Sequence, residues 1–219
     1  MKIAIVGLGK MGYQIVEKLL ADNFEVVALD SNHDSVESAV KLGAIGALSR
    51  EDVVKKFEED EIIIWLMIPA GAIENEIKEW QSILPRGSTL IDGGNSDFRL
   101  TQKRAQQLTN NNIKYIDIGT SGGILGIKEG FSMMVGGTKE SYDQITPVLR
   151  TLSRPSGSFN FFGPSGSGHF VKMVHNAIEY GIMESIAEGY HVLREGPFDE
   201  IDLSKVAEVW QHGLSLIHI

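Results

Sequence analysis

The sequence predicts an α/β protein in which a doubly wound, mostly parallel sheet is followed by an all-α domain. Short apolar runs alternate with amphipathic helical segments through the first three quarters of the chain, which is typical of such a sheet. Helical periodicity then continues without a clear break from about residue 168 to about residue 194. We therefore expect a sheet domain over residues 1–164 and the start of a helical domain over residues 165–219.

The predicted strands are rich in Ile, Val and Leu, and most of them end at Gly, Asp or Pro. They span residues 2–7, 25–30, 61–67, 88–94, 113–119 and 131–137, with a weaker strand at 158–163. The predicted helices between them include residues 11–22, 71–83, 97–110 and 139–152. Because the strands are almost continuously apolar, both faces of the sheet should be covered by helices.

The helical domain is expected to be truncated. The segment "EGPFD" (195–199) ends the long helix with Gly and Pro, and Asp202 is expected to cap a second helix that runs to the terminus. The last residues, "GLSLIHI", resemble the interior of a helix without a stop signal. Because about fifty residues make a poor core alone, we expect a homo-oligomer that forms through this domain.

Composition argues against several classes of protein. The chain of 219 residues has a formal net charge of -9, which disfavours nonspecific binding to nucleic acid or to an anionic membrane. It contains no cysteine, which excludes disulfides, thiol catalysis and cysteine-based zinc sites. The start resembles a strand rather than a signal peptide, and no apolar run approaches the roughly 20 residues of a membrane span. These features predict a cytoplasmic protein.

A glycine motif follows the first predicted strand. "GLGKMG" places Gly7, Gly9 and Gly12 in the pattern G-x-G-x-x-G, directly before an amphipathic helix. This context predicts a Rossmann-type dinucleotide site, with a tight turn at Gly7, close approach to a pyrophosphate at Gly9 and helix packing at Gly12. The free amides at the start of the helix, where Lys10 and Met11 lie, suit the pyrophosphate. The alternative is that the glycines serve only a tight turn.

An acidic residue ends the second predicted strand. Asp30 follows Gly12 by 18 residues, where a carboxylate can accept hydrogen bonds from the adenosine ribose hydroxyls. The same charge would repel a ribose 2′-phosphate, and no Lys or Arg lies between Asn23 and Val40 to neutralise it. His33 and Lys10 are the only nearby residues that weaken this argument. NAD is therefore predicted in preference to NADP.

Later strands contribute further candidates at the same edge of the sheet. Met67, in "WLMIPAG", is expected to border the cofactor. Asn95 and Ser96, in "DGGNS", are expected to offer amide and hydroxyl groups to the nicotinamide or the substrate, although Asn95 is equally plausible as a helix cap.

A serine and two glycines follow the strand expected at 113–119. Ser121, Gly122 and Gly123 are suited to a nest of backbone N–H groups around a carboxylate, because no large side chain would block its approach. An ordinary turn explains the same residues equally well.

Four polar residues share one face of the long predicted helix. In "GHFVKMVHNAIEYG", Lys172, His175, Asn176 and Glu179 lie at i, i+3, i+4 and i+7. Apolar side chains flank this stripe, so we expect the polar groups to lie in a protein crevice, where they would pair with one another or with a ligand. A Lys–Glu pair on a solvated helix face is the structural alternative.

Three motifs, taken in order, carry a resemblance to a known family. "GLGKMG", "SGG" and "GSGHFVKMVHN", which contains G-x-G-x-x-x-K-x-x-x-N, resemble the β-hydroxyacid dehydrogenase superfamily. Within it, "DGGNS", "GTSGGILGIKEGFSMMVGG" and "HFVKMVHNAIEYG" are similar to 6-phosphogluconate dehydrogenase, in particular its shorter, NAD-preferring bacterial form. The resemblance implies oxidative decarboxylation of 6-phosphogluconate to ribulose 5-phosphate and CO2, without a metal.

The resemblance also implies roles for individual residues. Lys172 would be the general base and Glu179 the general acid. Asn95 would bridge cofactor and substrate, and Tyr180 would contact the phosphate. The remaining substrate contacts would be Ser121, Gly122, Gly123, His175 and Asn176. The basic residues that hold the phosphate in the family would lie beyond residue 219.

Three other interpretations remain open. A related dehydrogenase acting on a small acid such as 3-hydroxyisobutyrate would share Lys172 and Asn176, but would not require His175 or the pair of Glu179 and Tyr180. The chain could also be a noncatalytic NAD-binding fragment. A metal site formed by His175, Glu179 and His169 is the weakest of the three, because only one pair has suitable spacing.

Overall fold

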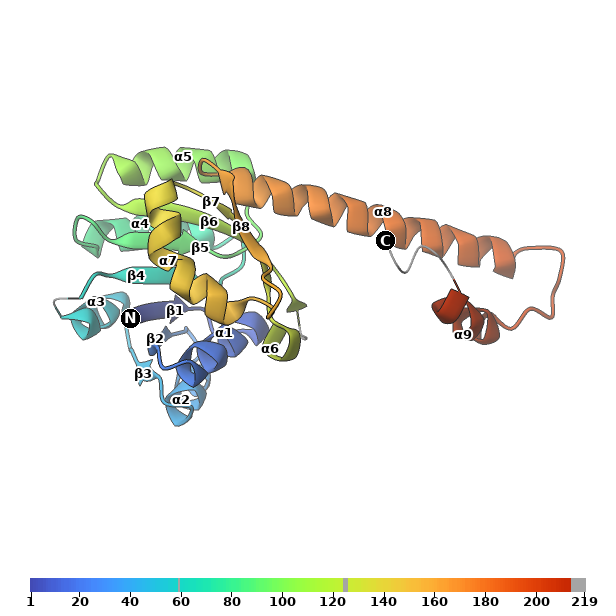
Figure 1. Ribbon diagram of the computed structural model, residues 1–219, viewed down its shortest axis with the longest axis horizontal. Coiled ribbons are helices and arrows are strands. Elements are labelled where there is room, and N and C mark those ends of the chain that lie inside the picture. The colour runs from blue at the N-terminus through green and yellow to red at the C-terminus, as the bar shows by residue number, and fades with distance from the viewer. Residues whose placement is uncertain (59, 124–125, 214–219) are drawn as a thin grey trace. The chain divides into compact units, whose positions relative to one another are not determined.

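A computed structural model describes residues 1–58, 60–123 and 126–213 of the chain (Figure 1). The chain divides into two compact units, Met1–Met173 and Val174–Ile219. The first unit holds the sheet with its helices and the beginning of a long helix. The second holds the rest of that helix and a further one.

An eight-stranded sheet forms the centre of the first unit, in the order β3-β2-β1-β4-β5-β6-β7-β8. β6 and β7 pair antiparallel and all other neighbours pair parallel. The order of the first six strands is that of dinucleotide-binding sheets, which confirms the predicted fold class. The strands are β1 (Lys2–Val6), β2 (Glu25–Leu29), β3 (Ile45–Gly46), β4 (Ile63–Leu66), β5 (Thr89–Asp92), β6 (Lys114–Ser121), β7 (Ser132–Gly136) and β8 (Phe159–Gly163).

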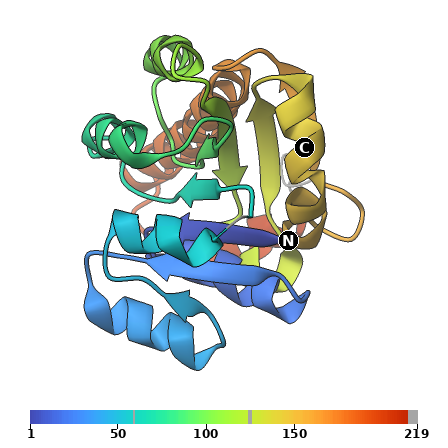
Figure 2. The same cartoon turned by 90° about the vertical axis from the view of Figure 1, so that its left-hand side faces the viewer.

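Helices cover both faces of this sheet (Figure 2). Apolar side chains of α1, α2 and α7 pack in one buried cluster, and those of α3, α4 and α5 pack in a second cluster. Two separate clusters are what nearly continuous apolar strands require, since both faces of each strand must be removed from water. The helices are α1 (Lys10–Ala21), α2 (His33–Lys41), α3 (Arg50–Phe57), α4 (Ile73–Ile83), α5 (Phe98–Thr109), α6 (Gly126–Glu129) and α7 (Lys139–Leu152).

Side-chain caps begin most of the longer helices. Asn32, Ser49, Asp97 and Thr138 each accept a hydrogen bond from a backbone N–H of the helix that follows. α1 and α4 differ, because they begin after Gly9 and Ala72 without a side-chain cap. The cap of α5 is Asp97, so the alternative role of Asn95 as a helix cap is not observed.

The structure contains elements that the sequence analysis did not specify. They are α2, α3, α6 and the two-residue strand β3. Their buried stripes are short: α2 buries Val36 and Ala39, and α3 buries Val53 and Phe57. Two buried positions give a weak periodic signal in the sequence.

The long helix α8 (Ser167–Arg194) confirms the predicted helical run. Its first turns belong to the first unit, where Gly168, His169 and Lys172 are buried. Within the described chain the expectation of a crevice beyond Lys172 was wrong, because Val174 is 40% exposed and Ile178 is 60% exposed. The homo-oligomer stays a prediction, which sedimentation of the purified chain would test.

The second unit continues with α9 (Leu203–Gly213). Its start is capped as predicted, because the Asp202 carboxylate accepts a hydrogen bond from the Ser204 N–H at 2.9 Å. Tyr190 of α8 packs edge-on against Trp210 of α9, with ring centroids 5.6 Å apart. The predicted continuation of this helix to the terminus lies outside the described residues. No helix in the described part of the chain has the length and apolar character needed to cross a bilayer.

Candidate dinucleotide and substrate site

The glycine-rich turn joins β1 to α1 and has little room for side chains. Gly7 has a φ of 94°, and its β-carbon position lies 2.5 Å from the carbonyl oxygen of Met67. A β-carbon on Gly12 would lie 1.9 Å from the Gly7 carbonyl oxygen, so α1 packs directly on the turn. A β-carbon on Gly9 would instead point into open space. The uncapped start of α1 is therefore open to an anion.

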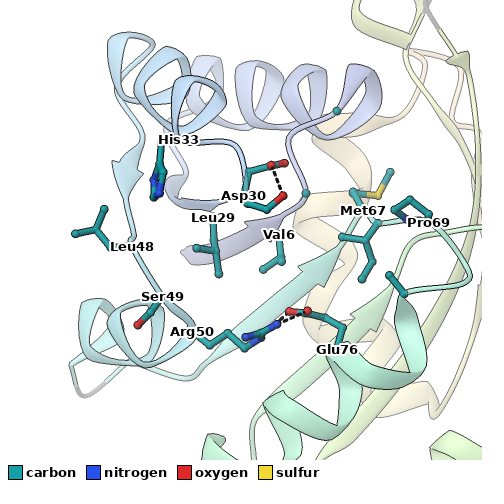
Figure 3. A pocket seen from close by; sticks show the side chains of 15 residues that line it. Val6, Leu29, Asp30, His33, Leu48, Ser49, Arg50, Met67, Pro69 and Glu76 are labelled. Carbon is teal, nitrogen blue, oxygen red and sulfur yellow. Dashed lines mark hydrogen bonds and ion pairs between the residues drawn. The ribbon is translucent and has the colours of Figure 1, made fainter.

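A cavity of about 800 Å³ lies beside this turn (Figure 3). Gly7, Gly9, Asp30 and Met67 line it, so the fold brings together four residues that were predicted to bind the cofactor. They come from the ends of β1, β2 and β4, which are neighbours in the sheet. A dinucleotide is expected at this edge of a doubly wound sheet.

The Asp30 carboxylate already has backbone partners. It accepts hydrogen bonds from the Leu8 N–H at 2.5 Å and from the Asn32 N–H at 2.8 Å. Asp30 thereby ties the glycine-rich turn to the loop before α2. The Ser31 hydroxyl also donates to Oδ1 at 3.4 Å, whereas Oδ2, among the described residues, accepts only from Leu8 and keeps acceptor capacity for a ribose.

Sequence reasoning missed an ion pair in the wall of the cavity. Arg50 and Glu76 both line it, and the Arg50 Nε and Nη2 atoms donate to the two Glu76 oxygens at 2.9 and 2.6 Å (Figure 3). The hydrogen bond to Glu76 raises the pKa of Arg50 above its usual value. The expectation that only His33 and Lys10 bear on the charge of this site was therefore wrong. Arg50 comes from α3, ten residues after Val40, and Glu76 neutralises its charge.

Other predicted cofactor residues lie outside this cavity. Lys10 lines a neighbouring hollow together with Gly9 and Tyr13. Met11 and Gly12, in the first turn of α1, are not among the described residues that line the 800 Å³ cavity. Asn95 is not among them either, and its side chain is exposed.

The loop after β5 is organised by a buried carboxylate. Asp92 is fully buried and accepts hydrogen bonds from the Ser96 hydroxyl at 2.8 Å and the Gly94 N–H at 3.1 Å. The Ser96 hydroxyl therefore points inward, and the expectation that it faces nicotinamide or substrate was wrong. Asn95, between these anchored residues, remains exposed.

The end of β6 carries the predicted carboxylate loop. Gly122 has a φ of 152° and Gly123 has a φ of 51°, values that glycine adopts without strain. Ser121 is partly buried and is the last residue of β6. The continuation of the loop at residues 124–125 lies outside the described residues.

The Lys172 side chain begins against the same strand. It is 8% exposed, and a β-carbon on Gly119 would lie 2.3 Å from its Cβ atom. Gly119 lies two residues before Ser121, so β6 carries both the contact for Lys172 and the predicted carboxylate loop. The roles predicted for Lys172 and for this loop stay predictions.

The remaining helix candidates belong to the second unit. His175 Nδ1 lies 3.7 Å from a Glu179 oxygen and 3.4 Å from Asn176 Oδ1. Tyr180 is 68% exposed. Nowhere among the described residues do three His, Cys, Asp or Glu side chains gather in a geometry that could hold a metal ion.

Comparison with known families agrees with the geometry. Residues 2–163 match the family described as the NAD binding domain of 6-phosphogluconate dehydrogenase, and residues 168–217 match its C-terminal domain. The chain belongs to the 6-phosphogluconate dehydrogenase family. The resemblance seen in the sequence motifs is thereby confirmed, and the chain contains an NAD(P)-binding Rossmann domain of an oxidoreductase family.

Individual members of the family and solved structures are similar to this chain over most of its length. It is 40% identical over 214 residues to the NAD(+)-dependent, decarboxylating 6-phosphogluconate dehydrogenase of Haloferax volcanii, covering 97% of this chain and 70% of that protein. The 6-phosphogluconate dehydrogenase of Plasmodium falciparum superposes with a TM-score of 0.84 at 28% identity, over 97% of this chain and 48% of that one. A 3-hydroxyisobutyrate dehydrogenase of Salmonella typhimurium shares the fold at 21% identity, with a TM-score of 0.80 over 97% of this chain and 73% of that one. The fold therefore does not decide the substrate.

Proposed function

We propose that this protein oxidises 6-phosphogluconate with NAD and decarboxylates the product to ribulose 5-phosphate and CO2. The observation that carries the proposal is the position of Lys172, which is almost buried against Gly119 on the strand that ends in the Ser121–Gly123 loop. The name of the Haloferax volcanii relative, "NAD(+)-dependent, decarboxylating", supports the choice of reaction and cofactor.

The residues of the first unit fit a dinucleotide. The open side of Gly9 and the uncapped start of α1 suit a pyrophosphate, and the Asp30 carboxylate suits a ribose with free hydroxyls. The ion pair of Arg50 with Glu76 leaves no net charge on that part of the wall. The charge of Asp30 then disfavours a 2′-phosphate, which supports NAD rather than NADP.

Lys172 acts first, as a general base. Its neutral amine takes the proton from the C3 hydroxyl of the substrate. Bound NAD would accept the hydride that leaves C3, and the product of this oxidation is a β-keto acid. The amides of Ser121, Gly122 and Gly123 hold the substrate carboxylate, which orients C3 toward Lys172.

Decarboxylation and proton return complete the reaction. The Lys172 ammonium transfers its proton to the C3 carbonyl oxygen, which accepts the electron pair as the bond to the carboxylate breaks, so CO2 leaves and an enediol remains. Glu179 donates a proton to the carbon that lost CO2, which becomes C1 of ribulose 5-phosphate, while the C3 oxygen returns its proton to Lys172. Lys172 and Glu179 lie two turns apart on α8, about 10 Å along its axis. Proton exchange with solvent resets both groups. His175, Asn176, Tyr180 and Asn95 are proposed as further substrate contacts.

The proposal is tested by product stoichiometry. Purified protein is mixed with 6-phosphogluconate and either NAD or NADP, and NADH or NADPH is measured together with CO2. We expect reduced cofactor and CO2 in equal amounts, with NAD preferred. 3-Hydroxyisobutyrate serves as the comparison substrate, because its oxidation would yield NADH without CO2.

The other outcomes identify the alternatives. NADH formed only with 3-hydroxyisobutyrate would replace the proposed substrate with a small hydroxy acid. NADH binding without turnover of either acid would identify a noncatalytic dinucleotide-binding chain. Failure to bind either dinucleotide would refute the cofactor assignment itself.

Cofactor choice should change when the charge at the end of β2 changes. In the double variant Asp30→Ala/Ser31→Arg, the ribose hydroxyls of NAD lose the carboxylate that accepts their hydrogen bonds. The 2′-phosphate of NADP gains a positively charged partner. We expect the affinity for NADH, divided by the affinity for NADPH, to fall by about 100-fold. Each of the two substitutions should contribute about tenfold, which corresponds to about 1.4 kcal/mol. Fluorescence titration with each reduced cofactor measures the two dissociation constants.

The control places the same substitutions outside the cavity. Asp34→Ala/Ser35→Arg alters α2 at residues that do not line the described cavity wall. It should leave the affinity ratio unchanged. An unchanged ratio in the Asp30 variant would show that cofactor choice is decided elsewhere, with the Arg50–Glu76 pair as the next candidate.

A further inference from the structure

One face of β6 supports the beginning of α8. Side chains alternate along a strand, so Asp117, Gly119 and Ser121 lie on the same face. Gly119 contacts Lys172, and Ser121 begins the proposed carboxylate loop. Asp117 is the third residue of this face, and the mechanism above gives it no role.

The Asp117 side chain binds the start of α8 directly. It is fully buried, and its Oδ1 and Oδ2 atoms accept hydrogen bonds from the Gly166 N–H at 2.7 Å and the His169 N–H at 2.9 Å. Gly166 precedes α8 and His169 lies in its first turn. A carboxylate of the sheet thus replaces the usual side-chain cap from the helix's own sequence, where negative charge also complements the helix dipole.

Glycines allow the backbone to pack closely around this carboxylate. Gly136 faces Asp117 across the antiparallel pair, and a β-carbon there would lie 2.6 and 2.8 Å from the two carboxylate oxygens. A β-carbon on Gly168 would lie 2.4 Å from the Met134 carbonyl oxygen. The first turn of α8 therefore lies directly on the backbone of β6 and β7.

The buried charge is costly in itself. Burial raises the pKa of Asp117, and the neighbouring His169 together with the two N–H donors opposes this rise. His169 is in turn held from α5, where its Nδ1 atom shares a hydrogen bond of 2.8 Å with the Thr101 hydroxyl. Helix α8 is therefore fixed from two sides three residues before Lys172.

We propose that Asp117 is the positioning residue for Lys172, because it anchors the first turn of α8 on β6 and so places the lysine amine relative to the Ser121–Gly123 loop. This inference rests on the proposed function, in which Lys172 is the base. A misplacement of about 1 Å in a catalytic group can cost about 100-fold in rate.

Two variants of Asp117 and one control test the inference. Asp117→Asn keeps the shape and one acceptor oxygen, whereas Asp117→Ala removes both acceptors. Thr138→Ala is the control, because it removes the side-chain cap of α7. The Thr138 hydroxyl accepts a hydrogen bond from the Ser141 N–H at 3.1 Å, and Thr138 is not among the described residues that line the 800 Å³ cavity. Measurements are kcat and KM with 6-phosphogluconate and NAD, the NADH dissociation constant, and acetylation of Lys172 by a lysine reagent, read by mass spectrometry.

We expect a graded loss of turnover without loss of cofactor binding. Asp117→Asn should lower kcat about tenfold and Asp117→Ala about 100-fold, with NADH affinity within about twofold of wild type. Lys172, which is 8% exposed, should become acetylated faster in both variants. Thr138→Ala should lower the melting temperature while kcat and Lys172 acetylation stay unchanged.

Two results would overturn the inference. The first is that Asp117→Ala keeps the wild-type kcat and the wild-type rate of Lys172 acetylation. The second is that both Asp117 variants lose NADH affinity by the same factor as kcat, which indicates general damage to the fold. If the wild-type chain shows no turnover, the proposed function fails separately. Lys172 acetylation then decides: faster labelling supports the anchor, and unchanged labelling rejects it.

Discussion

Lys172→Met should abolish most of the turnover while leaving NADH binding nearly intact. Methionine preserves the apolar stem that packs on Gly119, but it cannot accept the proton of the C3 hydroxyl or polarise the C3 carbonyl. General acid–base groups contribute about 10²–10⁴-fold, so we expect kcat to fall by about three orders of magnitude. Initial rates of NADH formation and fluorescence titration with NADH measure the two quantities.

The matched control is a lysine without a proposed role. Lys103 is an exposed residue of α5, and Lys103→Met should leave both kcat and NADH affinity unchanged. If Lys172→Met retains wild-type turnover, Lys172 is not the base. If it loses NADH binding as well, the lysine supports the fold or the cofactor rather than the proton transfer.

Substitutions in the glycine-rich turn should separate folding from cofactor binding. In Gly12→Ala the new β-carbon meets a backbone oxygen at 1.9 Å, so α1 must move away from the turn. Overpacking of this kind costs roughly 1–3 kcal/mol, and NADH affinity should fall at least about tenfold because the turn is displaced. Thermal unfolding and NADH titration measure the two effects.

Gly9→Ala provides the contrast. Gly9 has a φ of -64° and open space on its side-chain position, so alanine fits the fold without strain. The methyl group instead occupies the wall of the cavity, and we expect about tenfold weaker NADH binding at unchanged melting temperature. Gly189→Ala, in an open position of α8, should not weaken NADH binding. Wild-type affinity in Gly9→Ala would mean that the pyrophosphate does not approach this residue.

Much of the fold was predictable because its signals are local. The strands and the helices of residues 10–21, 98–109 and 139–152 follow from short apolar runs and from stripes at helical spacing. The predicted helix cap at Asp202 depends on a bond to a residue only two positions away. The short elements α3 and β3 carried too few buried residues for such a signal.

The candidate site was predictable only in part. The glycine motif and Asp30 were recognisable because their spacing repeats the geometry of one strand–turn–helix unit. Arg50 and Glu76 are 26 residues apart and meet only because α3 and α4 lie side by side. Ser96 illustrates the same limit, because its inward orientation depends on the buried Asp92 carboxylate.

The sequence by itself determined the alternation of strands and helices, the glycine-rich turn, and the spacing of Lys172 and Glu179 along one helix, because each depends on neighbours within a few residues. Only the tertiary structure decided which side chains support these groups. Asp117 holds amides 49 and 52 residues away, and Gly119 contacts a lysine of another element. Such pairings depend on strand order and on the close approach of α8 to the sheet, and no local pattern in the chain encodes them.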